Sequence, residues 1–330
     1  MSHTPPRASA PHALAVDLGG TNLSCAVVDR QGRILADLHR SSLADRSADE
    51  ILANLADALR QVLAASGVRG ESLAGIGIGA PGIVHPEEGV IHRAANFPAF
   101  RDLPLARLVG EGFGLPVRLH HDVDMALLAE QRLGAGRGKR HLLCLTVGTG
   151  IGLALFLNGR LFVGSRAGAG NLGHLILDPD ADPAECNVRG YLEHRASGPA
   201  VRAAAIEAVR QGRLTSLRQR CGDDPERIDA RMVFAAARAG DAVCAAIVGR
   251  TAHLLGVAIA NLVNLLDPEV VIVGGGVAQA NDALFAPLVE SARTYVCAFL
   301  RDRLTIVPAQ LGEDAGLIGA GLSVWGHEDD

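Results

Sequence analysis

The chain has 330 residues, of which 48% are hydrophobic and 20% are charged, so a large core is available and wholesale disorder is excluded. The net charge is −5 and the lysines and arginines form no run, which argues against a nucleic-acid-binding protein because such proteins need a clustered basic face. This length exceeds what one hydrophobic core usually serves, so we expect two domains or lobes.

The N-terminus, the cysteines and the apolar segments indicate a cytoplasmic protein without a membrane span. Residues 1–12 are rich in Pro, Ser, His and Ala, and we expect a tail there rather than a signal peptide. The six cysteines are scattered and form no CxxC pair, which is typical of reduced core residues in the cytoplasm. The most apolar stretch, residues 252–266, is interrupted by His253, Asn261 and Asn264, which predicts a buried helix.

In chain order, the first half opens with strands joined by a glycine-rich turn. Residues 14–28 predict strand, turn and strand, and Asp29-Arg-Gln-Gly32 predicts a hairpin to a third strand over residues 33–38. The apolar spacing that follows predicts a helix, a strand, a helix, a strand and a helix, over residues 48–65, 73–80, 103–113, 117–120 and 125–133.

The second half repeats this plan. Residues 142–156 predict strand, glycine turn and strand, and Asn158-Gly159 is the strongest two-residue signal for a hairpin turn. Helices are predicted over residues 198–211, 229–239, 241–266, 282–298 and 316–324. Strands are predicted over residues 161–163, 270–273 and 304–307.

Strands that alternate with helices predict an α/β fold with a largely parallel sheet. Because each half opens on a glycine hairpin, we expect a duplicated, two-lobed architecture with a cleft between the lobes. We place an N-terminal lobe at residues 13–121 and a C-terminal lobe at residues 122–330. The last helix, at about residues 315–325, is expected to return to the N-terminal lobe.

Three glycine clusters are candidate phosphate sites. In Asp17-Leu-Gly19-Gly20-Thr21, glycine lets backbone N–H groups approach a phosphate, the hydroxyl adds a donor, and the acid can hold Mg²⁺ through water. Gly148-Thr149-Gly150 offers the same donors in the second half, and Gly274-Gly275-Gly276 follows a strand. Each cluster alone fits a tight turn. Two clusters at matching positions of a duplicated unit favour phosphate binding.

Two further glycine patterns lack the context of a nucleotide site. Residues 134–140 resemble a P-loop, but the spacing is one residue short and Arg140 replaces Ser or Thr. Residues 168–173 match the GxGxxG dinucleotide fingerprint, but Pro179 and Pro183 follow where a helix should run.

An ordered set of motifs extends over nearly the whole chain, from Leu14 to Trp325. Its members are Asp17-Leu-Gly-Gly-Thr21, Pro81-Gly82, Asn96-Phe-Pro98, His121-Asp122-Val-Asp124, Gly148-Thr-Gly-Ile-Gly152, Gly173-His174, Arg189-Gly190-Tyr-Leu-Glu193, Ala196-Ser-Gly-Pro199, Gly274-Gly-Gly-Val277 and Asp314-Ala-Gly-Leu-Ile-Gly-Ala320. This set resembles the ROK family of sugar kinases and sugar-responsive repressors, within the actin/hexokinase superfamily, whose fold is ribonuclease-H-like.

The resemblance implies that ATP and Mg²⁺ are bound by the glycine motifs, with Asp17 holding Mg²⁺ through water. The implied nucleotide-binding residues are Asp17, Gly19, Gly20, Thr21, Asn22, Gly148, Thr149, Gly150, Gly274, Gly275 and Gly276. The implied sugar-binding residues are Asn96, His121, Asp122, Asn171, His174 and Glu193.

The resemblance also makes Asp122 the general base. A sugar hydroxyl is a poor nucleophile, and a positioned carboxylate can accept its proton as it attacks the γ-phosphate. On its own, Asp122 would be interpreted as the N-cap of the helix over residues 125–133, and it can serve both roles.

Three departures from the family pattern stand out. Asn171 occupies a position that is usually Glu, which can weaken sugar binding or change the preferred sugar. The family's structural zinc site has three cysteines and a histidine, but only Cys186 and His174 remain here, so we predict no zinc. His121 and Asp124 replace residues that are commonly Asn, and an added carboxylate at Asp124 can raise the pKa of Asp122 or can simply face solvent.

The leading hypothesis is an ATP-dependent kinase for a hexose hydroxyl, first of all the 6-hydroxyl of glucose. Alternatives are a kinase for another hexose or an N-acetylhexosamine, a non-catalytic sugar-binding regulator, and an NAD-dependent oxidoreductase that uses residues 168–173. The first motif begins about a dozen residues into the sequence, which leaves no room for a helix-turn-helix domain and favours the kinase. The helix over residues 244–266 suggests a homodimer.

Overall fold

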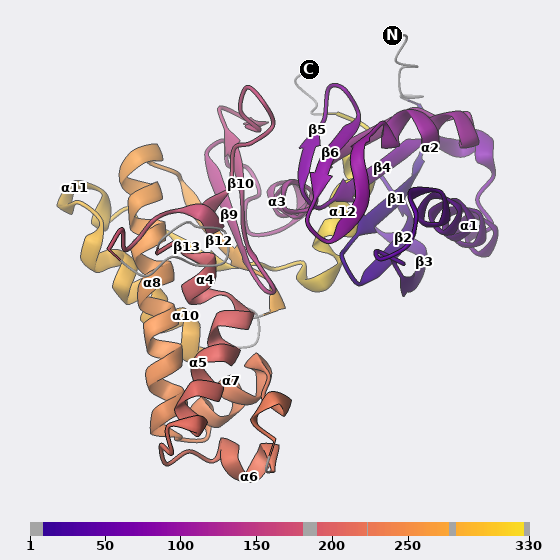
Figure 1. Cartoon of the computed structure of the whole chain (residues 1–330). Coiled ribbons are helices and arrows are strands. Elements are labelled where there is room, and N and C mark those ends of the chain that lie inside the picture. Colours follow the sequence, from indigo (N-terminus) through magenta and orange to yellow (C-terminus); the bar gives the residue numbers. More distant parts are fainter. Residues whose placement is uncertain (1–8, 181–189, 223, 277–281, 327–330) are drawn as a thin grey trace. The chain divides into compact units, whose positions relative to one another are not determined.

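The structure, a computed structural model, describes residues 9–180, 190–222, 224–276 and 282–326, in two compact units (Figure 1). Unit 1 contains residues 1–138, 154–169 and 313–330, and unit 2 contains residues 139–153 and 170–312. The expected boundary between residues 121 and 122 is therefore wrong. Helix α3 (Asp122–Leu133), which was assigned to the second lobe, belongs to unit 1, as does the last helix, α12 (Ala315–Ser323).

The sheet of unit 1 has five strands in the order β3-β2-β1-β4-β8. They are β1 (His12–Leu18), β2 (Asn22–Asp29), β3 (Ile34–Ser41), β4 (Leu73–Ala80) and β8 (Val117–His121). Strand β1 pairs antiparallel with β2 and parallel with β4, which in turn pairs parallel with β8. Every residue of β4 is buried, as expected for a strand covered on both faces.

Helices cover both faces of this sheet. Leu14 and Val16 belong to a core shared with α1 (Ala48–Ser66) and α2 (Leu105–Phe113). Ala15, one residue out of phase, packs in a second core with α3 and α12. The alternation follows from the two-residue period of a strand. Helix α1 starts at a capping box in which Ser47 and Glu50 bond each other's backbone N–H.

The predicted N-terminal tail is too long. Ala10 is buried, its carbonyl accepts a hydrogen bond from the Trp325 indole N–H at 3.1 Å, and His12 is already in β1. Residues 1–8 of the expected tail lie outside the described residues.

Two glycines allow α12 to pack closely in unit 1. A Cβ at Gly77 of β4 would overlap the carbonyl oxygen of Ala320, and a Cβ at Gly319 would overlap that of Met125. Because backbone cannot move aside cheaply, we expect Gly319→Ala to lower the free energy of unfolding by about 2–3 kcal/mol in urea denaturation. Gly112→Ala in α2 is the control, since no atom lies within 4 Å of the added methyl. Equal losses in both variants would contradict this packing.

A three-stranded antiparallel sheet in unit 1 was not predicted. It consists of β5 (Ile83–His85), β6 (Val90–Ala94) and β7 (Phe97–Leu103), in that order. Phe97 and Phe100 stack in the core with ring centroids 4.7 Å apart. Asn96 lies in the tight turn between β6 and β7, where Ala94 pairs with Phe97.

The second large sheet has the order β11-β10-β9-β12-β13 and repeats the plan of the first. Its strands are β9 (Leu142–Val147), β10 (Ile151–Leu157), β11 (Arg160–Leu161), β12 (Val270–Gly274) and β13 (Ile306–Pro308). Strands β9, β12 and β13 run parallel. The division between the units passes through β10, after Leu153. The shared strand order agrees with the duplication predicted from the sequence.

Helix α8 (Ala242–Leu266) is the central helix of unit 2. It is long and apolar enough to cross a membrane by length and composition, but 56% of its most apolar window is buried, as in the core helix of a soluble fold. It packs against α4 (Glu193–Ala196), α5 (Gly198–Arg210), α7 (Ala230–Arg238) and α10 (Asp282–Tyr295). Asp241 caps it by accepting hydrogen bonds from the N–H groups of Val243 and Cys244.

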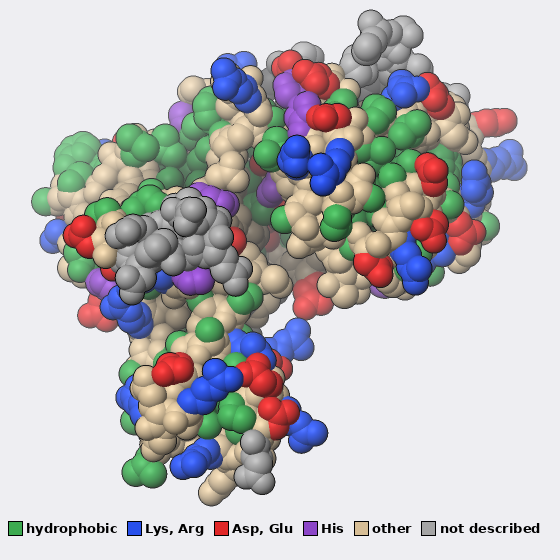
Figure 2. All heavy atoms as spheres, in the orientation of Figure 1, with side chains coloured by type: hydrophobic (Ala, Val, Ile, Leu, Met, Phe, Trp, Pro, Cys, Tyr) green, Lys and Arg blue, Asp and Glu red, His purple; other side chains and the backbone are tan. Residues whose placement is uncertain are grey.

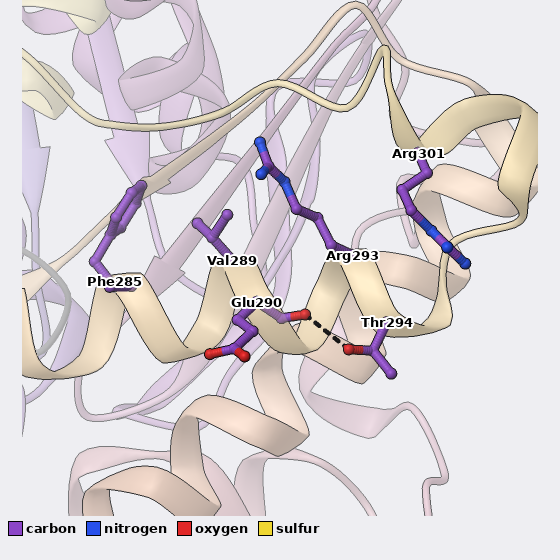
Figure 3. Close-up of a pocket in the computed structure, with 7 residues that line it drawn as sticks. Phe285, Val289, Glu290, Arg293, Thr294 and Arg301 are labelled. Carbon is purple, nitrogen blue, oxygen red and sulfur yellow. Dashed lines mark hydrogen bonds between the residues drawn. The ribbon is translucent and has the colours of Figure 1, made fainter.

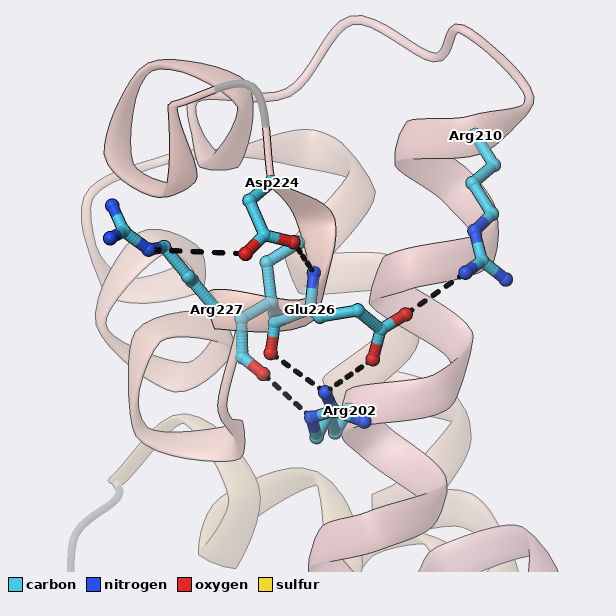
Figure 4. Close-up of polar contacts among 6 residues, drawn as sticks. Arg202, Arg210, Asp224, Glu226 and Arg227 are labelled. Carbon is cyan, nitrogen blue, oxygen red and sulfur yellow. Dashed lines mark hydrogen bonds and ion pairs between the residues drawn. The ribbon is translucent and has the colours of Figure 1, made fainter.

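Two arginines of α5 connect this helix to a short segment of unit 2 near α6. Arg202 of α5 donates to Glu226 Oε2 at 2.7 Å, and Arg210 donates to Glu226 Oε1 at 2.9 Å (Figure 4). These contacts link α5 to the 3₁₀ helix η3 (Pro225–Arg227), next to α6 (Leu217–Cys221). The helix predicted over residues 282–298 is interrupted before α11 (Ala298–Arg301).

Candidate active site

The carboxyl ends of three parallel strands in unit 1 bring Asp17 close to Asp122. Asp17, near the end of β1, pairs with Gly79 of β4, and Ala80 pairs with His121 at the end of β8. A Cβ added to Gly79 would lie 3.4 Å from the Cα of Asp122. Ligand sites of α/β sheets lie at this edge, because the loops after parallel strands converge there.

The glycine turn after Asp17 makes close contact with two other segments. The Gly19 N–H donates to the Asn22 carbonyl at 2.8 Å, which closes the turn between β1 and β2. A Cβ at Gly20 would lie 2.7 Å from Nδ2 of Asn96, and a Cβ at Gly316 would lie 3.1 Å from Oδ2 of Asp17. The structure therefore brings Asn96 and the start of α12 to the turn, where Thr21 and Asn22 are exposed.

Asp122 is the first residue of α3, and its N-cap is His121, so the expectation that Asp122 itself is the cap is wrong. Oδ1 of Asp122 accepts a hydrogen bond from the Val123 N–H at 2.8 Å and lies 3.1 Å from Nδ1 of His121. The side chain of Asp122 is 35% exposed, so a substrate can reach it.

Two neighbours of Asp122 are carboxyl groups with raised pKa values. Burial and, to a smaller extent, the charge of Asp122 raise the pKa of Asp17 to about 6, while His39 opposes the shift. Burial likewise raises the pKa of Asp124 to about 7, while His121 lowers it and Asp122 raises it. The charge of Asp122 thus contributes to the raised pKa of both neighbours.

This charge makes the edge suitable for a cation. Carboxylate oxygens are ligands that Mg²⁺ prefers, and a cation beside Asp17 and Asp122 would relieve the repulsion between them. Within the residues that the structure describes, no group of three or more His, Cys, Asp or Glu side chains is placed to hold a metal ion by itself. The carboxylates of Asp17 and Asp122 fit an ion that keeps water and phosphate oxygens among its ligands, as Mg²⁺ does.

The two glycine clusters of unit 2 lie at the carboxyl edge of its sheet. Thr146 at the end of β9 pairs with Gly274 at the end of β12. The turn Gly148–Gly150 follows β9, and its Gly148 N–H donates to the Gly150 carbonyl at 2.9 Å. Gly275 has φ of +87°, and a Cβ there would lie 2.5 Å from the Val147 carbonyl oxygen, so only glycine fits this approach. Gly276 is exposed.

Glu193 connects the glycine turn of unit 2 to the segment that carries His174. Its Oε2 accepts a hydrogen bond from the Ile151 N–H at 2.7 Å. A Cβ at Gly150 or at Gly173 would lie within 3 Å of the same oxygen, at 2.8 and 2.9 Å. Glu193 thus has a structural role that spacing along the chain did not reveal.

The remaining sugar-binding candidates of unit 2 lie around the 3₁₀ helix η2 (Leu172–His174). Asn171 precedes η2 and is exposed, and His174 ends it and is exposed too. The ring of His174 stacks on that of Tyr191 at a centroid distance of 5.7 Å. Cys186, on which the prediction of no zinc depends, lies outside the described residues.

The structure divides the predicted site residues between the units. Unit 1 holds Asp17, Gly19, Gly20, Thr21, Asn22, Asn96, His121 and Asp122. Unit 2 holds Gly148, Thr149, Gly150, Asn171, His174, Glu193, Gly274, Gly275 and Gly276. Sequence reasoning assigned no role to Gly316, although its motif belonged to the ordered set, which was the signal that could have found it.

Comparison with known proteins agrees with this architecture. The model of the ROK family matches residues 13–325. A glucokinase from Thermotoga maritima is 34% identical over 307 residues, which cover 93% of this chain and 95% of that protein. The crystal structure of a ROK family glucokinase from Streptomyces griseus in complex with glucose and AMPPNP has a TM-score of 0.81 at 31% identity, covering 94% of this chain and 97% of that one.

A regulator is also among the similar structures. The crystal structure of a ROK family transcriptional regulator, a homologue of the E. coli MLC protein, has a TM-score of 0.84 at 26% identity. It covers 94% of this chain, but this chain covers 77% of the regulator.

Proposed function

The chain belongs to the ROK family and has its actin/hexokinase-like α/β fold, and we propose that it is a sugar kinase that transfers the γ-phosphate of ATP to a hexose hydroxyl. The 6-hydroxyl of glucose is the first candidate, since the Thermotoga maritima relative is a glucokinase and the Streptomyces griseus structure contains glucose and AMPPNP. The observation that carries the proposal is the accessible carboxylate of Asp122 beside Asp17, at the carboxyl edge of the sheet.

Asp122 is proposed as the general base. A carboxylate beside a sugar hydroxyl accepts its proton as the hydroxyl oxygen attacks the γ-phosphorus, and the bond from that phosphorus to the ADP oxygen breaks. Asp17 is proposed to hold Mg²⁺ through water, and the ion supplies charge neutralisation on the transferring phosphoryl group. Val123 contributes by fixing one oxygen of Asp122 through its backbone N–H.

The glycine turns are proposed as phosphate-binding segments. The backbone N–H groups of Gly19–Thr21 and of Gly148–Gly150 supply donors to phosphate oxygens. Asn22 and Thr149 are assigned to the same nucleotide contacts. Gly274–Gly276, at the end of β12, is assigned to the ribose or the base, because glycine lets a ligand approach the backbone.

The hexose is proposed to bind through directional hydrogen bonds rather than ring stacking. Aromatic residues make up only 3% of the chain, and the candidate sugar ligands are the polar residues Asn96, Asp122, Asn171, His174 and Glu193. Since Oε2 of Glu193 already accepts from the Ile151 N–H, its Oε1 is the oxygen assigned to the sugar. A site of this kind is sensitive to single substitutions, because a lost partner leaves a polar group unpaired.

A panel of sugars tests this proposal. ATP, Mg²⁺ and the whole chain are combined with glucose, mannose, fructose, N-acetylglucosamine and N-acetylmannosamine, and ADP release is followed by a coupled assay. We expect turnover with glucose above that with the other sugars. Turnover restricted to an N-acetylhexosamine or another hexose would correct the substrate, and no turnover with any sugar would refute the proposed kinase.

A non-catalytic sugar-binding regulator is the second candidate. It is favoured by the similarity to the ROK family regulator and by Asn171, which stands where family members usually carry a carboxylate. Calorimetric binding of a hexose by a chain that turns over no sugar would support it. The dinucleotide alternative loses its structural basis, because residues 168–173 run from a turn into the 3₁₀ helix η2 rather than joining a strand to an α-helix.

We propose that the protein binds no nucleic acid and works in the cytoplasm. Acidic and basic side chains are interspersed on the face shown in Figure 2, which fits a protein that does not bind nucleic acid. Among the described residues, the cysteines at 25, 144, 221, 244 and 297 form no disulfide, which fits a reducing cytoplasm.

A homodimer is proposed through helices α8, α10 and α11. Tyr295 and Phe299 are 49% and 69% exposed, and a hollow of about 720 Å³ runs along α10 (Figure 3). Phe285, Val289 and Arg293 line that hollow at intervals of one helical turn. Exposed apolar side chains beside charged ones are typical of surfaces that pair with another protein chain.

A further inference from the structure

We propose that His121 is a positioning residue that holds Oδ1 of Asp122, so that Oδ2 is the oxygen that takes the proton from the sugar hydroxyl. This inference rests on the proposed kinase function and goes beyond it, because it assigns separate tasks to the two oxygens of the base. It also gives His121 a role different from contact with the sugar.

The hydrogen bonds of Asp122 are unequally divided between its oxygens. Oδ1 accepts from the Val123 N–H at 2.8 Å and has Nδ1 of His121 at 3.1 Å. Within the part of the chain that the structure describes, Oδ2 has no hydrogen-bond partner. An oxygen that accepts a hydrogen bond and also lies beside an imidazole nitrogen is the weaker proton acceptor, since both neighbours stabilise the charge on it. The proton of the sugar hydroxyl therefore passes to Oδ2 as the hydroxyl oxygen bonds to phosphorus and the ADP oxygen leaves.

The imidazole of His121 is available to contact Asp122 because it makes no capping hydrogen bond. His121 is the N-cap of α3 with extended backbone (φ −66°, ψ 144°), yet its side chain makes no capping hydrogen bond to the helix. A side chain at this position usually turns toward the N–H groups of the first turn. Here Nδ1 lies 3.1 Å from Oδ1 of the next residue instead, where a proton on Nδ1 would face the carboxylate.

The main chain of His121 is fixed from two sides. In strand β8 it pairs with Ala80 of β4, and its backbone N–H donates to the carboxyl group of Asp124. Asp124 is only 7% exposed and occupies the third position of the helix, from which an acidic side chain can reach back to the N-cap. With its backbone held in this way, the His121 ring starts from a fixed point beside Oδ1 of Asp122.

A matched pair of variants tests the role of His121. In His121→Asn, the amide nitrogen can occupy the place of Nδ1 and donate to Oδ1, whereas His121→Leu has a similar branched shape and no donor. We expect kcat for the preferred hexose to fall by about 10- to 100-fold in His121→Leu and by less than about 3-fold in His121→Asn. The KM for the sugar should change little in either variant.

Several results would overturn the proposal. Wild-type kcat in His121→Leu would show that Asp122 needs no support, and a rise in the sugar KM with unchanged kcat would assign His121 to the sugar instead. Equal losses of kcat in the Leu and Asn variants would also contradict it. Urea denaturation of both variants separates these effects from a loss of folding.

A readout without turnover separates this proposal from the kinase proposal. In ¹H–¹⁵N spectra, the ring signals of His121, assigned by their absence in His121→Asn, should show the proton on Nδ1 and should shift in Asp122→Ala. If they do and no sugar is phosphorylated, the kinase proposal fails while the positioning contact stands. If sugar is phosphorylated and the proton is on Nε2 alone, the positioning role fails.

Discussion

Replacement of Asp122 by asparagine is expected to lower kcat for the preferred hexose by about 10²- to 10⁴-fold, the range that general-base catalysis contributes. The amide has nearly the shape of the carboxylate and can still accept the Val123 N–H through its oxygen, so the start of α3 should remain intact. The amide lacks the second carboxylate oxygen and the negative charge, so it cannot accept the proton of the sugar hydroxyl. The coupled ADP-release assay measures kcat, and calorimetry measures whether the sugar still binds.

The control for Asp122→Asn is Asp45→Asn. The side chain of Asp45 is 84% exposed, so the same chemical change there should leave kcat within about 2-fold of the wild type, as for most surface substitutions. Full activity in Asp122→Asn would refute the assignment of the base. Lost activity together with lost sugar binding and a lower unfolding midpoint would instead mean that Asp122 maintains the structure of the site.

The order of the main elements could be predicted from the sequence because each has a strong local pattern. Helix α1 combines apolar helical spacing with the Ser47–Glu50 capping box, and Asn158-Gly159 makes its hairpin turn with positive φ at both residues. The sheet of β5, β6 and β7 was missed because β5 has three residues and the pairing of all three strands shifts in register. Short, irregular strands leave little periodicity to detect.

The arrangement of the site was harder to predict from the sequence, because spacing along the chain does not give the register between strands. Asp17 and Asp122 are far apart in sequence and meet only because β1, β4 and β8 pair in parallel with Asp17 opposite Gly79. The role of Glu193 as acceptor for the Ile151 N–H depends in the same way on packing between distant segments. The return of the last helix to unit 1 was expected from the sequence, but the assignment of residues 122–138 and 154–169 to the same unit was not.

The second large expected effect concerns Asp124 and pH. Burial raises the pKa of this carboxyl to about 7, whereas the same group in an unfolded chain titrates near 3.9. Between about pH 4 and 7 the folded protein retains a proton that the unfolded chain has released, so the stability contributed by this group is lost as the pH rises through that window. Above pH 7 Asp124 is ionised in the folded chain too, and the buried charge lowers the free energy of unfolding by its full amount.

Asp124→Asn removes this cost without removing the acceptor, because the amide oxygen can still receive the His121 N–H. We expect the variant to unfold at nearly the same urea concentration as the wild type at pH 4 and to be more stable by about 2–4 kcal/mol at pH 8, since each pKa unit is worth about 1.4 kcal/mol. Asp17, whose pKa is also raised, is present in both proteins, so its contribution largely cancels in the difference. A stability difference that stays constant from pH 4 to pH 8 would mean that Asp124 does not change its protonation on folding. A variant less stable than the wild type at pH 8 would mean that the charge of Asp124 is stabilised in the fold, for which the imidazole of His121 is the partner that the structure provides.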